Sequence, residues 1–467
     1  MTFAAPIPGS FRDPAGAVHD WDGKIYRTVS RCGAKAYETV RETGFLDQMI
    51  EQGRVVGLRE VTSPAILSAF PDAIHVLEHP RLKYISHPYE WCFQQLQDAA
   101  LHHLQLMLDA LAAGLTLSDA TAYNIQFVGS RPIFIDHLSF RPYVEGELWL
   151  GHNQFCEQFL NPLLLSAVCG ISFNEWYRGR LEGIPTSALA RLLPTRARLS
   201  FRMNAHVFLP AMLGKGNQSE AVARGGQKRK GSLSRMGYEG LLRQLRNWIA
   251  SLTPKDAGAT VWSDYADGNT YAETERKTKR HVVWDFASWT RPSVLIDLGC
   301  NSGDFSATAI DAGAKRVIGY DFDHGALAAA WKRARAGDLP FLPLFLDAAN
   351  PSPTQGWAQQ ERQGFEARAK GDAVIALAFI HHLVIGKNIA LHQAISWIVG
   401  RAQTGLIEFV PKSDPTVQAM LAHREDIFDT YTVDAFRAHL SGIATIENET
   451  AISSSGRIIF EYRAHAK

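Results

Sequence analysis

The chain has 467 residues, which is too long for one ordinary hydrophobic core and predicts two or three domains. Its hydrophobic content of 46% is typical of a globular protein, and 48 Lys and Arg balance 47 Asp and Glu to a formal charge of +1. This balance gives no signal for nucleic acid or an anionic membrane surface, so neither is expected as a partner.

Targeting signals and cysteine pairs are also missing from the pattern. Met1 to Gly16 lacks a basic region followed by an apolar core, so no secretory signal is expected. The most apolar stretch, residues 159–173, is interrupted by Pro162 and Gly170 and is too short to cross a bilayer. The cysteines stand without a CxxC pair or paired histidines, which indicates neither a zinc site nor a disulfide framework, and a cytoplasmic location is expected. They are Cys32, Cys92, Cys156, Cys169 and Cys300.

The first part of the chain predicts a small sheet followed by helices. Residues 17–29 read as two strands about the turn Asp22-Gly23, a strong hairpin signal. Residues 34–52 are expected to form a helix ended by Gly53, and strands are plausible at 54–61 and 73–77. A long core helix is predicted from Phe93 to Ala113, where apolar residues repeat at helical spacing.

Three polar residues follow this helix. Asp119 and Asn124 stand five apart, and Asp136 follows at the end of a predicted strand. The arrangement is similar to the catalytic loop and metal-binding aspartate of kinase-like phosphotransferases, which implies an α+β kinase-like domain over residues 1–213. Leu117 stands where that family has His, and no glycine-rich loop precedes it. The resemblance therefore leaves two roles open: binding of ATP and magnesium, or a degenerate domain in which these residues cap turns and which recognises substrate.

The middle of the chain separates two domains. Residues 155–203 are expected to be largely helical and to complete the first domain, whereas residues 214–235 lose apolar side chains and predict a flexible basic linker. A helix at 238–252 is expected to lead into a second domain, residues 236–467. Before its first strand lie aromatic residues, among them Tyr265 and Tyr271, followed by a charged helix containing Lys279.

Residues 293–323 predict a nucleotide-binding βαβ unit, in which a strand, a glycine turn and a helix are followed by a second strand. The buried run Val294 to Ile296 leads into the turn Asp297-Leu-Gly-Cys-Asn-Ser-Gly303, then a short helix, and then a second strand ending at Asp321. An acidic side chain there can accept hydrogen bonds from both hydroxyls of a ribose. The acidic turn disfavours a pyrophosphate and suits a cationic ligand.

This pattern resembles the first motif of class I S-adenosylmethionine-dependent methyltransferases, and residues 260–467 fit the same order. The resemblance implies a Rossmann-like seven-stranded α/β sheet whose last two strands are antiparallel. It also implies S-adenosyl-L-methionine as cofactor, with Tyr265, Tyr271 and Lys279 as a lid over its methionine end; alternatively, these aromatics only pack the domain. The residues implied to hold the cofactor in the sheet are Asp297, Gly299, Asn301, Gly303, Asp321, Asp347 and Ala348.

Candidate catalytic residues lie at the ends of the next two strands. The fourth strand, 372–380, is expected to end in His381-His382, and the fifth, 404–410, carries Glu408. A histidine can remove the proton of an acceptor hydroxyl near neutral pH, with Glu408 as alternative base or orienting group. Local packing of the two imidazoles is the competing interpretation.

The predicted function is methyl transfer to a small-molecule or glycan-like acceptor, with O-methylation favoured and the first domain aiding recognition. The arrangement resembles bacterial methyltransferases of nodulation-factor and secondary-metabolite modification. Alternatives are a noncatalytic S-adenosylmethionine sensor and a bifunctional enzyme whose first domain is an ATP-dependent phosphotransferase. The sequence specifies neither the acceptor nor the oligomeric state.

Overall fold

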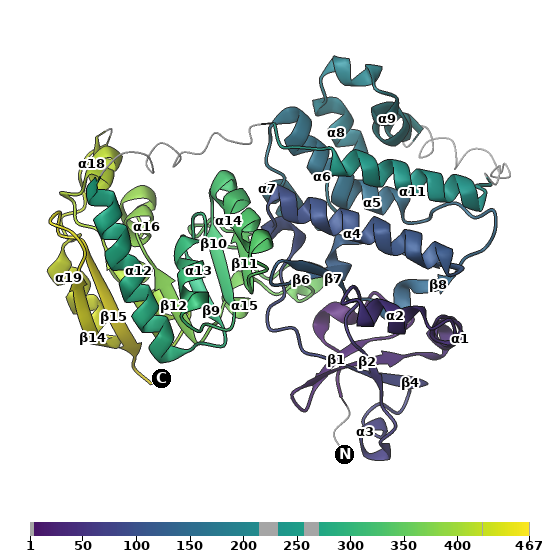
Figure 1. The fold of residues 1–467 in the computed structure, drawn as a ribbon, viewed down its shortest axis with the longest axis horizontal. Helices are drawn as coiled ribbons and strands as arrows, with labels where there is room; N and C mark the ends of the chain where they lie inside the picture. The colour runs from purple at the N-terminus through teal and green to yellow at the C-terminus, as the bar shows by residue number, and fades with distance from the viewer. Residues whose placement is uncertain (1–3, 214–231, 256–269, 423, 467) are drawn as a thin grey trace. The chain divides into compact units, whose positions relative to one another are not determined.

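The structure, a computed structural model, describes residues 4–213, 232–255, 270–422 and 424–466, and the chain divides into two compact units (Figure 1). The first unit comprises Met1–Val128, Pro132–Ala257 and Thr354–Arg362; the second comprises Gly129–Arg131, Gly258–Pro353 and Gln363–Lys467. Within the described ranges, no helix is both long and apolar enough for a bilayer span. All five cysteines are free thiols, as expected without a disulfide framework.

An antiparallel sheet of four strands in the order β1-β2-β4-β3 opens the first unit. Its strands are β1 (Val18–Trp21), β2 (Lys24–Val29), β3 (Arg59–Glu60) and β4 (His75–His79). The predicted hairpin is confirmed, because Trp21 pairs with Lys24 across the two-residue turn. Asp22 and Gly23 both adopt positive φ, which matches the twist of the flanking strands. The predicted strand at 54–61 is limited to β3.

Two helices replace the single helix predicted at 34–52. They are α1 (Arg31–Glu42) and α2 (Phe45–Glu51), and the break falls at Gly44, which has φ of 69°. Apolar residues from both helices, including Tyr37, Val40, Leu46 and Met49, are buried. The helical prediction was therefore correct for most of this range, but a left-handed glycine turns the chain in the middle of it.

The helix α4 (Phe93–Ala112) is the long core helix that the sequence predicts. Its residues at helical spacing, Leu96, Ala100, Leu104, Met107 and Leu111, are at most 2% exposed. Two short pairs follow: β5 (Leu115–Leu117) with β8 (Phe140–Pro142), and β6 (Ile125–Val128) with β7 (Arg131–Phe134). The loop between β5 and β6 carries Asp119 and Asn124.

The helix α11 (Arg235–Ala250) belongs to the first unit, which differs from the predicted start of the second domain at residue 236. Its buried face of Tyr238, Leu242, Leu245 and Ile249 packs on α4. Gln97 of α4 donates to the carbonyl of Ile249, with an N to O distance of 2.7 Å. The apolar face of α11 packs on α4 and so places α11 in the first unit. The predicted domain boundary rested on the polar composition of residues 214–235, which does not reveal this contact.

The predicted helical character of residues 155–203 is confirmed in outline, with π-helical segments interrupting the α-helices. The α-helices here and earlier are α3 (Pro64–Leu67), α5 (His152–Phe155), α6 (Asn161–Leu164), α7 (Asn174–Gly179), α8 (Thr186–Leu192) and α9 (Phe201–Met203). The π-helical segments are η5 (Cys156–Leu160), η6 (Leu165–Cys169) and η8 (Asn204–Phe208). The 3₁₀ turns are η1 (Pro8–Ser10), η2 (Pro88–Glu90), η3 (Ala122–Asn124), η4 (His137–Ser139), η7 (Thr195–Leu199) and η10 (Trp357–Gln359).

A seven-stranded sheet in the order β11-β10-β9-β12-β13-β15-β14 forms the second unit. Its strands are β9 (Leu295–Leu298), β10 (Val317–Asp321), β11 (Phe341–Phe345), β12 (Ala373–Ala376), β13 (Thr404–Phe409), β14 (Ala444–Ala451) and β15 (Ile458–Ala464). The first five strands are mutually parallel, whereas β15 runs antiparallel to both β13 and β14. The predicted seven-stranded sheet and the antiparallel pairing of its last two strands are confirmed.

Helices alternate with these strands. They are α12 (Thr270–Thr290), α13 (Asp304–Asp311), α14 (His324–Ala336), α15 (Phe365–Arg368), α16 (Ile380–Lys387), α17 (Leu391–Val399), α18 (Pro415–Leu421) and α19 (Val433–Ser441). Every residue of β9 and β12 is buried, Asp297 of β9 included, as expected of parallel strands covered on both faces. The predicted fourth strand ends early, because Ala378 has φ of 48° and turns the chain into α16. His381 and His382 therefore lie in the first turn of a helix.

Candidate functional site

A tight loop joins β9 to α13 at the centre of the parallel sheet. Gly299 and Gly303 adopt φ of 79° and 76°, a conformation that side chains rarely tolerate. A Cβ atom at Gly303 would lie 2.4 Å from Cε1 of Phe341, and one at Gly299 would lie 3.0 Å from Cδ2 of Phe379. Both glycines are thus required by backbone conformation and by close packing, and Asn301 between them is an exposed residue.

Asp297, in β9, lies beneath this loop and is only 3% exposed. Its Oδ2 accepts a 2.5 Å hydrogen bond from the hydroxyl of Ser306 in α13. Burial raises the pKa of Asp297 to about 7, the Ser306 hydrogen bond opposes this shift, and the charge of Asp321 adds to it. A carboxyl group that ionises near neutral pH is favoured in its charged form by a cation bound beside it.

Asp321, the last residue of β10, is held by backbone amides. Its Oδ2 accepts from the N–H of Asn301 at 2.8 Å, and its Oδ1 accepts from the N–H of Asp323 at 2.9 Å. Burial raises the pKa of Asp321 above its ordinary value, and these hydrogen bonds oppose the shift. Because each carboxylate oxygen has two acceptor positions, each keeps one for a ligand hydroxyl. This geometry suits a vicinal diol.

Asp347 and Ala348 follow the end of β11 and are half-buried. Oδ1 of Asp347 accepts from the N–H of Ala349 at 3.0 Å. Since β11, β10 and β9 are neighbours in the parallel sheet, the structure places Asp347, Asp321 and Asp297 at three adjacent strands toward one edge. Ligands of open parallel sheets bind at the carboxyl ends of such strands.

Glu408, near the end of β13, is fully buried and surrounded by donors. Its Oε2 lies 2.8 Å from Nζ of Lys279 and accepts from the N–H of Ala378 at 2.8 Å, while Arg457 donates to its Oε1 at 3.3 Å. Ala378 is the residue with left-handed backbone before α16. Glu408 thus anchors α12 and stabilises a strained turn, which favours a positioning role over that of a free base.

The two histidines of α16 differ in exposure. His381 is 1% exposed, and neither of its ring nitrogens has a hydrogen-bond partner among the described residues; His382 is half-buried. Their ring centroids lie 4.2 Å apart. Burial, with His382 and Arg457 nearby, lowers the pKa of His381 to about 2, and burial lowers that of His382 to about 4. Both imidazoles are neutral at pH 7, and His382 is the stronger base of the two.

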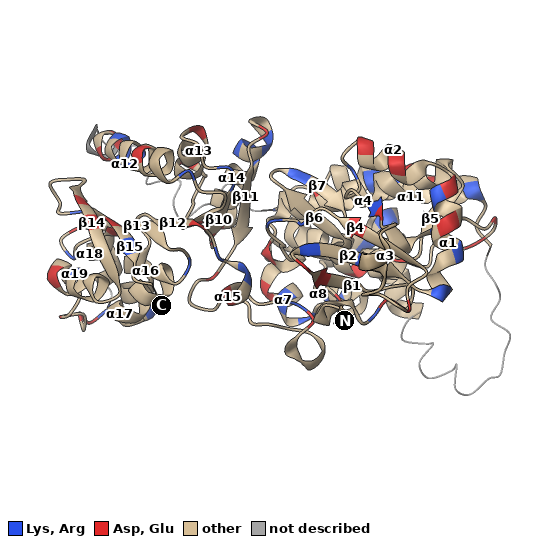
Figure 2. Ribbon diagram, turned by 90° about the horizontal axis from the view of Figure 1, so that it is seen from below, with Lys and Arg blue, Asp and Glu red and all other residues tan. Residues whose placement is uncertain are grey.

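The charged helix α12 contacts the glycine loop through residues that the sequence interpretation did not single out. Arg280 makes a bidentate ion pair with Asp304, the first residue of α13, and Arg276 donates to the same carboxylate at 3.0 Å. The closely spaced basic residues of α12 could have indicated these ion pairs from the sequence. Figure 2 shows both basic and acidic residues along this helix. Beside these pairs, a surface depression of about 600 Å³ is lined by Arg280, Trp284, Asp304 and Arg333, among others.

Of the three residues predicted to form a lid, only the side chain of Lys279 lies within the described part of the structure. Tyr265 lies outside the described residues, and so does the side chain of Tyr271, whose backbone belongs to α12. Lys279 is buried against Glu408. The structure therefore joins one predicted cofactor residue to one predicted catalytic residue.

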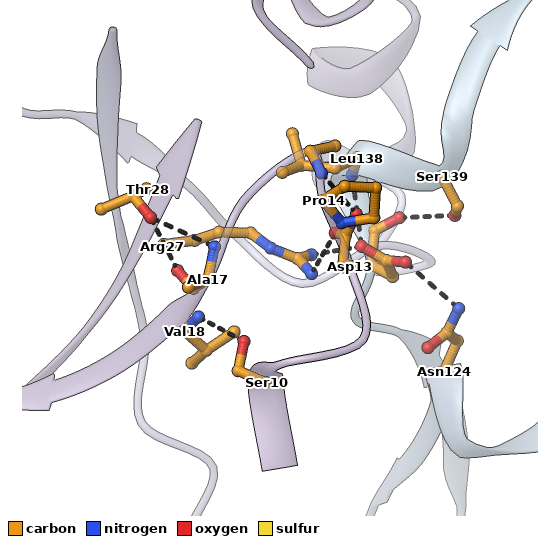
Figure 3. Close-up of polar contacts among 12 residues, drawn as sticks. Ser10, Asp13, Pro14, Ala17, Val18, Arg27, Thr28, Asn124, Leu138 and Ser139 are labelled. Carbon is orange, nitrogen blue, oxygen red and sulfur yellow. Dashed lines mark hydrogen bonds and ion pairs between the residues drawn. The ribbon is translucent and has the colours of Figure 1, made fainter. Parts of the chain in front are cut away.

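In the first unit, Asp119, Asn124 and Asp136 come together with Asp13 and Arg27. Figure 3 shows Asp13, Arg27 and Asn124 of this group. Nδ2 of Asn124 lies 3.2 Å from Asp119 and 3.3 Å from Asp136. Arg27 of β2 forms ion pairs with Asp136 and with Asp13. We call Asp13, Asp119 and Asp136 the carboxylate cluster. Burial, followed by the charges of Asp136 and Asp13, raises the pKa of Asp119 to about 7.

Arg27 was not anticipated as a member of this group. It is 8% exposed and reaches the carboxylate cluster from a different sheet. A guanidinium group already supplies the positive charge that a divalent cation would bring to these carboxylates. This arrangement favours a charge-compensated, structural cluster.

Comparison with known proteins gives one relative along the whole chain. Nodulation protein NoeA of Rhizobium meliloti (strain 1021) is 46% identical over 467 residues, which cover 99% of this chain and 98% of the relative. Ribosomal protein L11 methyltransferase of Shewanella frigidimarina (strain NCIMB 400) is 28% identical over 132 residues, covering 24% of this chain and 44% of that protein. No family model matches the chain.

Solved structures with partial likeness include three proteins. WbdD shares 18% identity over 44% of this chain and 43% of its own, with a TM-score of 0.31. The magnesium protoporphyrin IX methyltransferase ChlM of Synechocystis PCC 6803, bound to SAH, shares 18% identity with this chain. The match covers 43% of this chain and 91% of ChlM, with a TM-score of 0.30. The N-methyltransferase NodS of Bradyrhizobium japonicum WM9, also in complex with SAH, shares 14% identity with this chain. The match covers 43% of this chain and 91% of NodS, with a TM-score of 0.31.

Proposed function

The chain belongs to the family of the nodulation protein NoeA, and we propose that its second unit transfers a methyl group from S-adenosylmethionine to a hydroxyl of a small or glycan-like acceptor. The observation that carries this proposal is the row of carboxylates at adjacent strands of the parallel sheet, beside a glycine loop. Asp321 offers paired acceptors for a ribose, and Asp297 offers a buried negative charge for a cationic ligand.

The residues present fit this cofactor. Gly299 and Gly303 allow the left-handed backbone of the loop and its close packing on Phe379 and Phe341, and the N–H of Asn301 donates to Asp321. Asp347 and Ala348 lie next along the sheet, where an adenine would follow the ribose. When bound, the cofactor supplies an electrophilic methyl group, so the protein has to align the acceptor oxygen and remove its proton.

The proton acceptor proposed for this step is His382. It is neutral at pH 7, less buried than His381, and follows Phe379, whose ring packs on Gly299 of the glycine loop. His381 and Glu408 are assigned positioning roles, since His381 is the weaker base and both oxygens of Glu408 are engaged.

The first unit is proposed to recognise the acceptor without phosphoryl transfer. The ion pairs of Arg27 with Asp13 and Asp136 support this reading of the carboxylate cluster over an ATP and magnesium site. The relative along the whole chain is named a nodulation protein, and the acceptor class that we propose remains a small molecule or a glycan-like compound.

Calorimetric titration with S-adenosylmethionine tests the cofactor site. Asp321→Ala is expected to weaken binding at least tenfold, because the ribose hydroxyls lose two charged acceptors. Asp434→Ala is the control, since Asp434 is an exposed carboxylate on α19. Equal affinities in the two variants would refute the placement of the site.

Transfer of labelled methyl groups to a panel of oligosaccharides and hydroxylated metabolites then separates enzyme from sensor. O-methylation is supported if the wild-type chain forms labelled product and His382→Gln forms much less of it while its affinity for the cofactor is unchanged. Tight binding without transfer to any acceptor supports the noncatalytic sensor instead.

A further inference from the structure

Two histidines and a cysteine from distant parts of the first unit meet in its helical region. His152 lies in α5, Cys156 begins η5, and His206 lies in η8. Nε2 of His152 is 3.1 Å from Nδ1 of His206 and 3.6 Å from Sγ of Cys156, and the three atoms all lie within 4.8 Å of one another. We call these residues the His-Cys-His triad.

These separations are close to those of a tetrahedral zinc site. With Zn–N near ~2.05 Å and Zn–S near ~2.3 Å, two ligand nitrogens stand about 3.3 Å apart and a nitrogen and a sulfur about 3.5 Å apart. The two distances from His152 differ from these values by only small amounts, and Sγ of Cys156 lies within 4.8 Å of Nδ1 of His206. Small side-chain rotations therefore suffice to bring the three atoms around one ion.

The surroundings hold His206 in the tautomer that a metal requires. Its Nε2 lies 3.0 Å from Oε1 of Gln244 in α11, and a carbonyl oxygen can only accept, so Nε2 carries the proton. Nδ1 of the same ring is then the lone-pair nitrogen that faces His152 and Cys156. Metal-binding histidines usually donate their other N–H to such a partner.

Local backbone also distinguishes this place. Both η5, which contains Cys156, and η8, which contains His206, are π-helical. Single π-helical turns occur frequently at functional sites because they redirect side chains from the regular helical spacing. Cys156 and His206 are buried, whereas His152 is half-buried and leaves one side of the triad nearer to solvent.

We propose that the His-Cys-His triad binds one Zn²⁺ ion through Nε2 of His152, Sγ of Cys156 and Nδ1 of His206, with the fourth position open to water. On binding, the Cys156 thiol releases its proton and the thiolate coordinates the ion, while the proton of His152 moves to Nδ1. Soft thiolate together with imidazole favours zinc over magnesium or calcium. The sequence interpretation predicted no zinc site, because the triad has no CxxC spacing.

The site would also stabilise the loop of the carboxylate cluster. Two glutamines lie on the same helical segment as His152 and Cys156: Gln154 between these two ligands, and Gln158 after Cys156. Gln154 accepts from the N–H of Ala120, and Gln158 accepts from the N–H of Ala122, each at 2.8 Å. An ion that fixes α5 and η5 to η8 therefore fixes the supports of the loop bearing Asp119.

The experiment is titration of the chelator-treated full-length chain with Co²⁺, followed by displacement with Zn²⁺. We expect one equivalent of Co²⁺ to bind with a thiolate-to-cobalt charge-transfer band, and Zn²⁺ to abolish the band and raise the Tm. Cys156→Ser should lose the band and the Tm shift. Cys169→Ser, a half-buried cysteine of the same unit, should keep both.

Absence of the band in the wild-type chain, or its retention in Cys156→Ser, would overturn the proposal. X-ray absorption of the zinc-loaded wild-type chain needs no variant and decides the case in which Cys156→Ser fails to fold. One sulfur at about 2.3 Å together with nitrogen ligands at about 2.0 Å supports the triad, and a shell of nitrogen and oxygen alone refutes it.

Discussion

Lys279 of α12 and Glu408 of β13 form a buried ion pair, with 2.8 Å between Nζ and Oε2. Arg457 shares the same carboxylate at 3.3 Å and makes a closer pair with buried Asp414 at 2.7 Å, so two buried anions compensate two cations. Side chains 129 positions apart in the sequence are thereby joined, and α12 is tied to the strand that supports the turn at Ala378.

Glu408→Gln is expected to lower the free energy of unfolding by about 3 kcal/mol, because the buried Lys279 loses its counter-charge, whereas Arg457 keeps its pair with Asp414. Urea denaturation followed by circular dichroism measures this. Glu447→Gln, which breaks the exposed pair with Arg463, should change the same quantity by no more than about 0.5 kcal/mol. Similar losses in both variants would contradict the role of Glu408. The double variant Lys279→Met/Glu408→Gln should lose less than the sum of its single changes.

The affinity for S-adenosylmethionine is expected to depend on pH through Asp297. The pKa of this carboxyl is raised to about 7, and a cationic ligand prefers the ionised form, so binding should strengthen as pH rises from about 6 to 8. Asp297→Asn should bind weakly and without this dependence, as measured by calorimetry at several pH values. Asp434→Asn should keep the wild-type profile, and a flat profile in the wild-type chain would exclude the assignment.

The carboxylate cluster predicts a pH-dependent stability. With its pKa raised to about 7 from an ordinary value of 3.8, Asp119 holds a proton in the folded state that the unfolded chain has released. Stability is therefore lost as pH rises through this window. Asp119→Asn should be more stable than the wild-type chain at pH 8, and the difference should shrink toward pH 4. Thermal unfolding across this range tests it, with Asp47→Asn as the exposed control; a gain independent of pH would disagree.

The glycine loop predicts a contrast between two Gly→Ala substitutions. Gly303→Ala forces a side chain into left-handed backbone and against Phe341, so a loss of at least about 2 kcal/mol of stability is expected. Gly240→Ala lies in α11 with no atom within 4 Å of the new Cβ, and a gain of about 0.5 kcal/mol is expected. Denaturant midpoints of the two variants on the same side of wild type would contradict the loop geometry.

Much of the fold could be predicted from local patterns. The run of buried strand residues, the glycine turn and the acidic strand ends predicted the parallel sheet with its antiparallel last two strands, because each strand and turn signals itself within a few residues. The same holds for the hairpin at Asp22-Gly23 and for α4. The ends of elements were less well predicted where a single left-handed residue decides them, as at Gly44 and Ala378.

The site depended on a mixture of local and distant information. The sequence by itself singled out the residues of the glycine loop and the carboxylates Asp297 and Asp321, since each is recognised from its position relative to its own strand. It also brought Asp119, Asn124 and Asp136 to attention through their spacing.

Only the tertiary structure decided which charges compensate these groups. Arg27 reaches the carboxylate cluster from another sheet, Glu408 engages Lys279 and Arg457, and His206 joins His152 and Cys156 across 50 residues. No local pattern encodes such partners, because a buried charge or a ligand atom is satisfied by whichever group the folded core brings within about 3 Å.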